Sequence, residues 1–201
     1  MKKVLAGLFF LISFGFVFGI QQEEKSLLSS EIKNDWKFKQ ADKDNWLPAT
    51  IPGCVHTDLI DNKLIGDPFF GTNEKDLQWI GEKDWIYETT FDVAKDLFSK
   101  KNIEMIFKGL DTYAKVYLNN MLVLDADNMF REWNVDCKRY LLPEGNVLRV
   151  EFKNVFSENL PKFNEAPYHL MACENNDQAD IQINMYSRKA GYHFGWDWGP
   201  R

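Results

Sequence analysis

The chain has 201 residues, of which 45% are hydrophobic, 15% aromatic and 27% charged, so it suits one packed domain and excludes disordered, collagen-like and coiled-coil classes. With 24 Lys and Arg against 30 Asp and Glu, the formal net charge is -6. An acidic chain lacks the clustered positive charge of a nucleic-acid-binding protein, so no nucleic-acid partner is expected.

Residues 1–20 have the pattern of a secretory signal peptide. Two lysines precede an uncharged run at residues 4–18, and Gly19 follows it. The run is shorter than the ~20 residues that a membrane-spanning helix needs. We therefore expect cleavage near Gly19 or Ile20, export to a secreted, periplasmic or lysosomal destination, and no membrane attachment after cleavage. An uncleaved N-terminal anchor is the alternative.

Residues 46–81 are rich in proline and glycine, which predicts mostly irregular loop. Within this region, Thr57 can cap a short helix that continues through residues 58–60. Asp58 behind it is expected to stabilise the first turn of that helix.

From Trp85 onward, residues with buried character alternate with polar ones, which is typical of strands with one buried face. Asn119 and Asn120 predict a tight hairpin between two of these strands, because Asn tolerates positive φ. Asp111 is expected to hold a turn. Strands separated by turns, with almost no helical periodicity, indicate an all-β sandwich or jelly roll. The expected strands are residues 85–93, 103–107, 113–118, 121–124, 131–135 and 147–152.

Residues 156–201, which include Pro161 and Pro167, do not follow this rhythm and are expected to form long loops that are functional or packed onto another part. The three cysteines predict one disulfide and one thiol, or three small buried hydrophobic residues. The three histidines lie far apart and indicate no metal site. The cysteines are Cys54, Cys137 and Cys173, and the histidines are His56, His169 and His193.

The ending of the chain, residues 191–201, carries the clearest chemical signal. Indoles flank a carboxylate in Trp196-Asp197-Trp198, between Gly195 and Gly199. An indole can stack on the apolar face of a sugar while a carboxylate accepts hydrogen bonds from neighbouring hydroxyls. Core packing of the aromatic rings is the alternative.

Burying Asp197 between indoles requires a partner for its charge. Arg188, Lys189, Arg201 or a bound ligand could fill that role. His193 is expected to be structural, with its ring satisfied by the backbone.

Several other motifs accompany this ending, at residues 46–59, 67–69, 71–74, 77–80, 84–85, 109–114, 116–119 and 127–131. Together with residues 188–201, they resemble the N-terminal domain of β-mannosidases in glycoside hydrolase family 2. The Trp196-Asp197-Trp198 sequence followed by Gly199-Pro200-Arg201 is similar to β-mannosidases in particular.

The resemblance implies that residues 21–201 form a jelly-roll, galactose-binding-like β-sandwich, and that the chain is part of an exported exo-β-mannosidase acting on terminal non-reducing β-D-mannose. In similar enzymes, immunoglobulin-like domains and a (β/α)₈ barrel follow, and the barrel holds the two catalytic Glu. No residue of this chain takes those roles, so we expect the chain alone to be inactive.

In similar enzymes the Trp-Asp-Trp loop enters the pocket of the barrel. The resemblance therefore implies that Asp197 accepts hydrogen bonds from the terminal mannose and that Trp196 and Trp198 line the substrate pocket. Glycoside hydrolysis of this type needs only carboxylates and water, so no cofactor is expected. The missing barrel domain is the partner that the resemblance implies.

Two other functions remain open at this point. The chain could be a non-catalytic carbohydrate-binding module that recognises mannosides without cleaving them. The enzyme could also be a family 2 glycosidase of another specificity, such as β-galactosidase, β-glucuronidase or exo-glucosaminidase.

Overall fold

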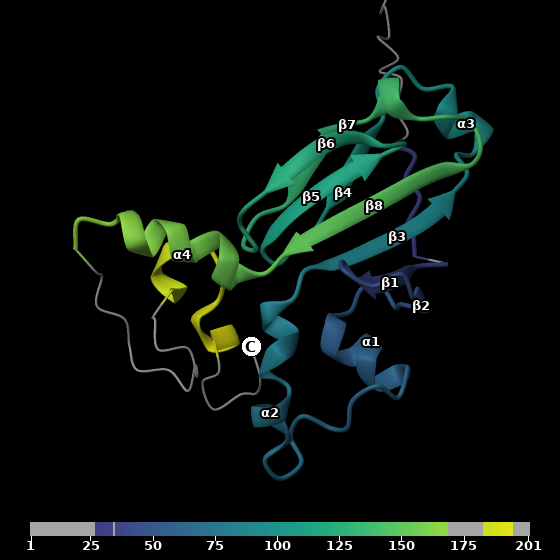
Figure 1. The fold of residues 1–201 in the computed structure, drawn as a ribbon. Coiled ribbons are helices and arrows are strands. Elements are labelled where there is room, and N and C mark those ends of the chain that lie inside the picture. Colours follow the sequence, from purple (N-terminus) through teal and green to yellow (C-terminus); the bar gives the residue numbers. More distant parts are fainter. Residues whose placement is uncertain (1–26, 34, 169–182, 195–201) are drawn as a thin grey trace, which may run out of the picture.

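The computed structural model describes residues 27–33, 35–168 and 183–194, and in these ranges the chain forms a mostly-sheet domain (Figure 1). The predicted signal peptide lies outside the described residues. No helix among the described residues is long and apolar enough to cross a membrane.

Most of the strands belong to one antiparallel sheet with the order β2-β1-β3-β8-β5-β6. A second, two-stranded antiparallel sheet pairs β4 with β7. The larger sheet consists of β1 (Lys37–Gln40), β2 (Leu47–Pro48), β3 (Trp85–Phe91), β5 (Tyr113–Leu118), β6 (Met121–Ala126) and β8 (Asn146–Lys153). The smaller sheet consists of β4 (Glu104–Phe107) and β7 (Trp133–Asp136).

The core joins the larger sheet to the smaller sheet and to buried residues of the segment between β2 and β3, such as Leu59 and Ile80. The two sheets together we call the sandwich. The alternation predicted for β3 is confirmed, because Trp85, Tyr87 and Thr89 are buried. Apolar residues of the smaller sheet, such as Met105 and Trp133, pack against this core. Burial of apolar surface between the sheets is the main stabilising contribution to such a domain.

The hairpin between β5 and β6 confirms the prediction for the asparagine pair. Asn119 and Asn120 have φ values of 51° and 66°. The Asn119 side chain accepts a hydrogen bond from the backbone N–H of Val147 (2.9 Å) and donates to the fully buried Asn146 (3.0 Å). The turn is therefore tied to β8 as well as to its own strands.

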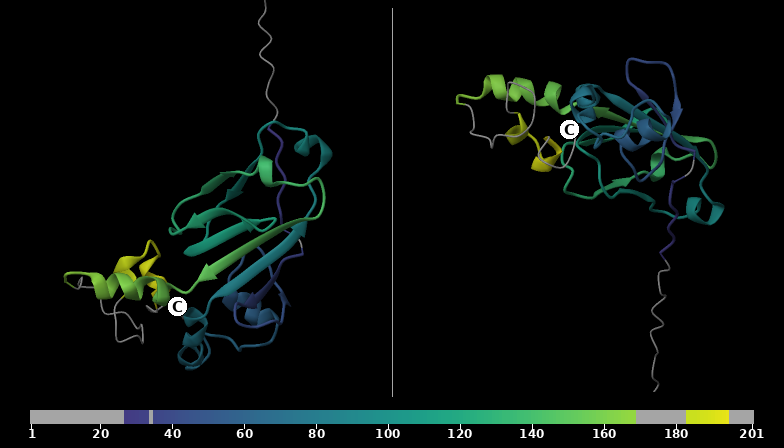
Figure 2. Two further views of the ribbon diagram at one scale, coloured as in Figure 1. Left: turned by 45° about the horizontal axis from the view of Figure 1, so that its top comes forward. Right: turned by 90° about the horizontal axis from the view of Figure 1, so that it is seen from below.

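Four α-helices and several short 3₁₀ turns connect or follow the strands in the described ranges. Figure 2 shows α4, η3 and η4 together at one end of the larger sheet. The α-helices are α1 (Val55–Asp61), α2 (Asn73–Asp76), α3 (Lys95–Phe98) and α4 (Val155–Glu165). The 3₁₀ turns are η1 (Gln78–Glu82), η2 (Lys138–Tyr140), η3 (Asn184–Tyr186) and η4 (Gly191–Phe194).

Helix α1 begins differently from the prediction. Cys54 is the N-cap, and the Thr57 hydroxyl lies inside the first turn, where it accepts from the backbone N–H of Cys54 (3.2 Å). Asp58 does not cap the helix. Its carboxylate is buried and accepts from the backbone N–H of Thr50 (2.9 Å) and the hydroxyl of Tyr87 (2.8 Å), so it joins α1 to β3.

Helix α4 corrects the expectation of irregular loop after residue 156. Pro161 lies inside this helix, although proline removes a backbone donor and normally ends a helix. Asn154 caps the helix by accepting from the backbone N–H of Ser157 (2.8 Å), and Asn159 is fully buried against the rest of the domain. Tertiary contacts therefore override the local preference of the sequence.

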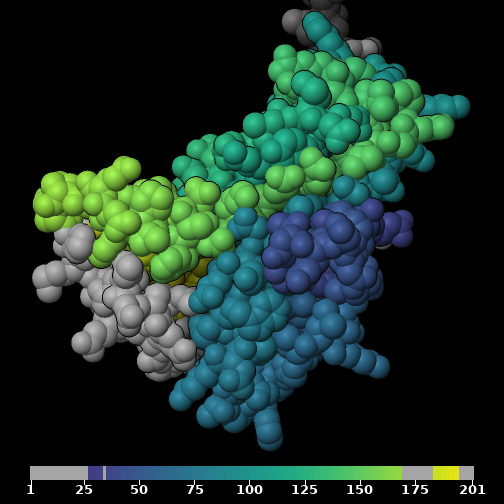
Figure 3. Space-filling view, viewed as in Figure 1, coloured from purple at the N-terminus to yellow at the C-terminus, as the bar shows by residue number. Residues whose placement is uncertain are grey.

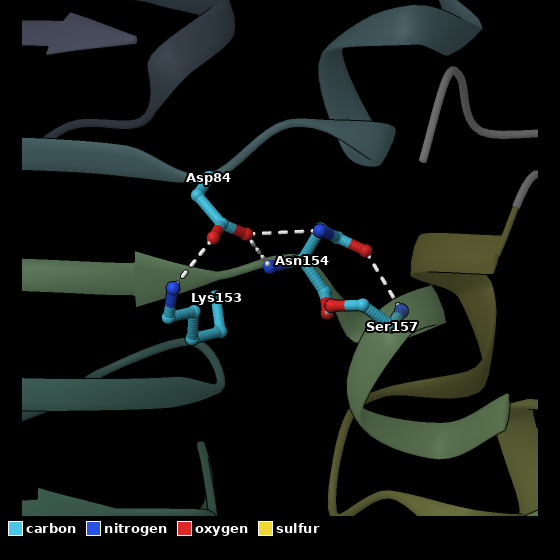
Figure 4. Close-up of polar contacts among 4 residues, drawn as sticks. All are labelled: Asp84, Lys153, Asn154 and Ser157. Atoms are coloured by element: carbon cyan, nitrogen blue, oxygen red, sulfur yellow. Dashed lines mark hydrogen bonds and ion pairs between the residues drawn. The ribbon is translucent and has the colours of Figure 1, made fainter. Parts of the chain in front are cut away.

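Asp84, just before β3, connects this helix to the sandwich (Figure 4). Its carboxylate accepts hydrogen bonds from the Lys153 ammonium (2.7 Å), the backbone N–H of Asn154 (2.8 Å) and the Asn154 side chain (2.9 Å). Burial by itself raises the pKa of Asp84, but these bonds and the charge of Lys153 outweigh it and hold the pKa below its usual value.

Because the pKa of Asp84 is lowered on folding, its stabilising effect is fully present above the ordinary carboxyl pKa of about 4 and is lost as the pH falls through the folded value. We expect Asp84→Asn to lower the free energy of unfolding by about 2 kcal/mol at neutral pH. The difference from wild type should shrink below about pH 4. Urea denaturation across this pH range measures the loss in free energy of unfolding and its pH dependence, with the exposed Asp44→Asn as control. An equal loss of stability at every pH would contradict the prediction.

Candidate functional site

The three residues predicted to contact substrate, Trp196, Asp197 and Trp198, lie outside the described residues, as does Arg201. The structure does describe residues 183–194, which precede this motif in the sequence and which we call the lead segment. It lies at one end of the sandwich beside α4 (Figure 1).

The lead segment buries few apolar side chains against the rest of the domain. Only Ile183, Ala190 and Phe194 are buried, whereas Met185 and Tyr192 are half exposed. Hydrophobic burial of three side chains, one of them alanine, is modest. Polar contacts with the sandwich and α4 must therefore contribute much of the attachment.

The first of these contacts is made by Asp111, immediately before β5. Its Oδ2 accepts a hydrogen bond from the Lys189 ammonium at 2.6 Å, and the His193 Nδ1 lies 3.2 Å from the same oxygen. Its Oδ1 accepts from the hydroxyl of Thr112. One carboxylate therefore contacts two side chains of the lead segment.

The charge of Asp111 is stabilised by these contacts. Burial by itself raises the pKa of Asp111, but the contact with His193 and the charge and hydrogen bond of Lys189 outweigh it and hold the pKa well below its usual range. The Lys189 side chain is only 14% exposed, so its ammonium depends on this carboxylate for charge compensation.

His56 on α1 is close enough to this cluster for the charge of Lys189 to act on it. Burial lowers the pKa of His56, and the positive charge of Lys189 lowers it further. Its Nε2 is enclosed and has no hydrogen-bond partner among the described residues. His56 therefore favours the neutral form, which avoids a second positive charge beside Lys189.

The second contact is a hydrogen-bonded group centred on Asn159 of α4. The Tyr113 hydroxyl donates to Asn159 Oδ1 (2.6 Å), and Asn159 Nδ2 donates to the backbone carbonyl of Ile183 (3.1 Å). The Lys162 ammonium donates to the Tyr113 hydroxyl (2.8 Å). The start of the lead segment is thus attached to both α4 and β5.

The third contact comes from the loop between β6 and β7. The backbone N–H of Met129 donates to the carbonyl of Arg188 (3.1 Å), and the backbone N–H of Ala190 contacts the Met129 sulfur at 3.0 Å. Asn128 and Arg188 form a short parallel bridge. Three separate parts of the domain therefore hold the lead segment.

The structure places two of the residues expected as candidate partners of Asp197. The ammonium of Lys189 is bonded to Asp111, and the guanidinium of Arg188 lies 5.9 Å from the ring centre of Phe130, whereas Asp197 itself lies outside the described residues. The His193 ring faces the Asp111 carboxylate rather than a backbone group, which corrects the expectation of backbone satisfaction.

Potential metal-ligating side chains do not gather in the part of the chain that the structure describes. No group of three His, Cys, Asp or Glu residues that could hold a metal ion occurs among the described residues. Cys54 is exposed and Cys137 is buried, and both are free thiols, whereas Cys173 lies outside the described ranges.

Sequence reasoning missed the roles of Asp111 and Asn159. Asp111 is 78 positions from Lys189, and Asn159 is 46 positions from Tyr113. Contacts over such separations leave no local periodicity. A buried asparagine in a segment expected to be loop carries no distinguishing sequence signal of its own.

Loss of the Asn159 side chain should weaken the attachment of the lead segment and destabilise the domain. Asn159→Ala leaves the carbonyl of Ile183 without this donor and creates a small cavity, so the free energy of unfolding should fall by about 2–3 kcal/mol. Chemical denaturation followed by circular dichroism measures the change. The exposed Asn45→Ala is the control, and equal stability of the two variants would contradict the prediction.

Comparisons with known proteins agree with this architecture. Residues 36–201 match the family described as glycosyl hydrolase 2 galactose-binding domain-like. Among curated proteins, beta-mannosidase B of Thermothelomyces thermophilus is 39% identical over 172 residues, which is 84% of this chain and 20% of the relative. Beta-mannosidase B of Aspergillus terreus is 35% identical over 180 residues, covering 87% of this chain and 21% of the relative.

Among solved structures, the beta-D-mannosidase of Dictyoglomus thermophilum superimposes with a TM-score of 0.76 at 38% identity, over 85% of this chain and 20% of that protein. The exo-chitosanase of Amycolatopsis orientalis shares the fold, with a TM-score of 0.52 at 17% identity over 58% of this chain and 16% of that protein.

This chain therefore spans about a fifth of the length of the beta-mannosidases that it matches. The match to the family extends from residue 36, just before β1, through the lead segment to residue 201. The chain belongs to the glycosyl hydrolase 2 galactose-binding domain-like family.

Proposed function

We propose that this chain is the N-terminal, sugar-positioning domain of an exported exo-β-mannosidase that removes terminal non-reducing β-D-mannose. The observation that carries the proposal is the likeness to a beta-D-mannosidase, with a TM-score of 0.76 and 38% identity over 85% of the chain. The similarity to beta-mannosidase B of Thermothelomyces thermophilus and of Aspergillus terreus supports the same substrate class.

In this proposal, Asp197 accepts hydrogen bonds from hydroxyls of the terminal mannose, and Trp196 and Trp198 line the pocket. A charged acceptor that binds vicinal hydroxyls fixes the orientation of the sugar. Contacts remote from the scissile bond position the substrate and can strengthen in the transition state.

Bond cleavage itself belongs, in this proposal, to a larger region of the polypeptide that follows the domain. A retaining glycosidase needs two carboxyl groups about 5 Å apart on opposite sides of the glycosidic bond. The proposal also takes residues 1–20 as the signal peptide for export and residues 21–201 as the N-terminal jelly-roll, sugar-binding domain. No cofactor takes part in it.

Removal of the Asp197 carboxylate should lower catalytic efficiency. In the full-length gene product, we expect Asp197→Ala to reduce kcat/KM for an aryl β-mannoside by roughly a hundredfold, which corresponds to about 3 kcal/mol for a charged hydrogen bond. Steady-state kinetics measure the effect. Glu144→Ala, in an exposed turn before β8, is the matched control and should retain wild-type kinetics.

Wild-type kinetics from Asp197→Ala would contradict the proposed role. Parallel assays with aryl β-galactoside, β-glucuronide and β-glucosaminide test the other specificities within the family. The reading frame after codon 201, together with the mass of the exported protein, tests the binding-module alternative. A stop at that codon, with calorimetric binding of mannose to the chain, would favour that alternative.

A further inference from the structure

The two contacts that Asp111 makes to the lead segment converge on a single atom. Lys189 and His193 approach the same oxygen, Oδ2, at 2.6 and 3.2 Å. Lys189 lies two positions before η4 (Gly191–Phe194), and His193 lies inside it. One oxygen therefore closes a short turn of the lead segment, and Trp196 follows His193 by three positions in the sequence.

Asp111 is itself firmly placed. Its other oxygen accepts from Thr112, which is buried, and β5 begins at the next residue. Strand β5 lies inside the larger sheet, where it pairs with β6 on one side and β8 on the other. The oxygen that holds η4 is thus fixed relative to the centre of the sheet.

We propose that Asp111 is a positioning residue for the Trp196-Asp197-Trp198 motif, and that it acts by fixing Lys189 and His193 immediately before the motif. This inference rests on the proposed function, because it assigns Asp111 a role in placing the sugar contacts. Asp111 itself does not contact substrate in this proposal.

The structure supplies a matched control for a purely structural role. Asp84 is also a partly buried carboxylate that binds a lysine ammonium, with 25% exposure and a distance of 2.7 Å, compared with 33% and 2.6 Å for Asp111. Asp84 connects β3, β8 and the start of α4, and its hydrogen bonds go to Lys153 and Asn154 rather than to the lead segment. Loss of either carboxylate should destabilise the domain, but only Asp111 should affect the motif.

A double variant distinguishes the structural role of Asp111 from its positioning role in a second way, because Asp111 is paired with the charge of Lys189. Asp111→Asn leaves the largely enclosed ammonium of Lys189 without its counter-charge, which is costly. The double variant Asp111→Asn/Lys189→Met removes both charges of the pair. It should recover stability relative to Asp111→Asn while the carboxylate contact to His193 stays absent.

The experiment compares wild type, Asp111→Asn, Asp84→Asn and the double variant in the full-length gene product, at a temperature well below every thermal midpoint. We expect Asp111→Asn and the double variant to lose roughly ten- to hundredfold in kcat/KM for an aryl β-mannoside, because a small misplacement of positioning groups has effects of this size. Asp84→Asn should remain within about twofold of wild type.

Hydrogen exchange supplies a readout that does not depend on activity. Backbone amides in residues 183–194 should exchange faster in Asp111→Asn and in the double variant than in Asp84→Asn, while amides of β3, β5 and β8 stay protected in all variants. If Asp111→Asn fails to fold, the double variant is compared with wild type and Asp84→Asn in its place.

Three results are decisive. Lowered kcat/KM and faster exchange of residues 183–194 in both Asp111 variants, but not in Asp84→Asn, support the proposal. Wild-type kcat/KM in the double variant, or an equal loss in Asp84→Asn, overturns it. Wild-type kinetics from Asp197→Ala would instead overturn the proposed function, so the two failures are distinguishable.

Discussion

The attachment of residues 183–194 to the sandwich depends on a partly buried carboxylate that faces a nearly enclosed ammonium. The Lys189 side chain is only 14% exposed, and the Asp111 carboxylate is the counter-charge that lies against its ammonium in the described part of the chain. The pair restricts where residues 183–194 can lie, because a misplaced partner leaves an uncompensated charge. The neutral form favoured by His56 fits the same charge balance.

Much of the sheet could be predicted from the sequence, because period-two alternation is a local signal. The alternation in β3 and the Asn119-Asn120 hairpin both appear in the structure as expected. The short strands β1 and β2 were not predicted, since runs of four and two residues carry too little periodicity. Their place at one edge of the sheet follows from the pairing of β1 with β3 and of β2 with β1, which only the folded chain reveals.

The predictions that were wrong concern segments whose conformation depends on contacts with residues far away in the sequence. Proline at position 161 argued for a loop, yet α4 forms, with Asn154 as its N-cap and Asn159 buried against the rest of the domain. Asp58 looked like a helix-capping residue, but Tyr87 and Thr50 use it as a buried acceptor. For the candidate site, the sequence identified the aromatic motif, whereas the contacts of the preceding segment depend on separations that no local pattern encodes.

The two polar contacts of α4 have a mechanical consequence. Asn154 at the cap is bonded to Asp84, and Asn159, about 7 Å further along the axis, is bonded to Tyr113. A helix attached at one point can rotate about that point, whereas attachment at two separated points fixes the direction of its axis. Helix α4, which extends past the end of the sheet in Figure 3, therefore has a defined axis, and a force on its C-terminal end is transmitted to β3 and β5 together.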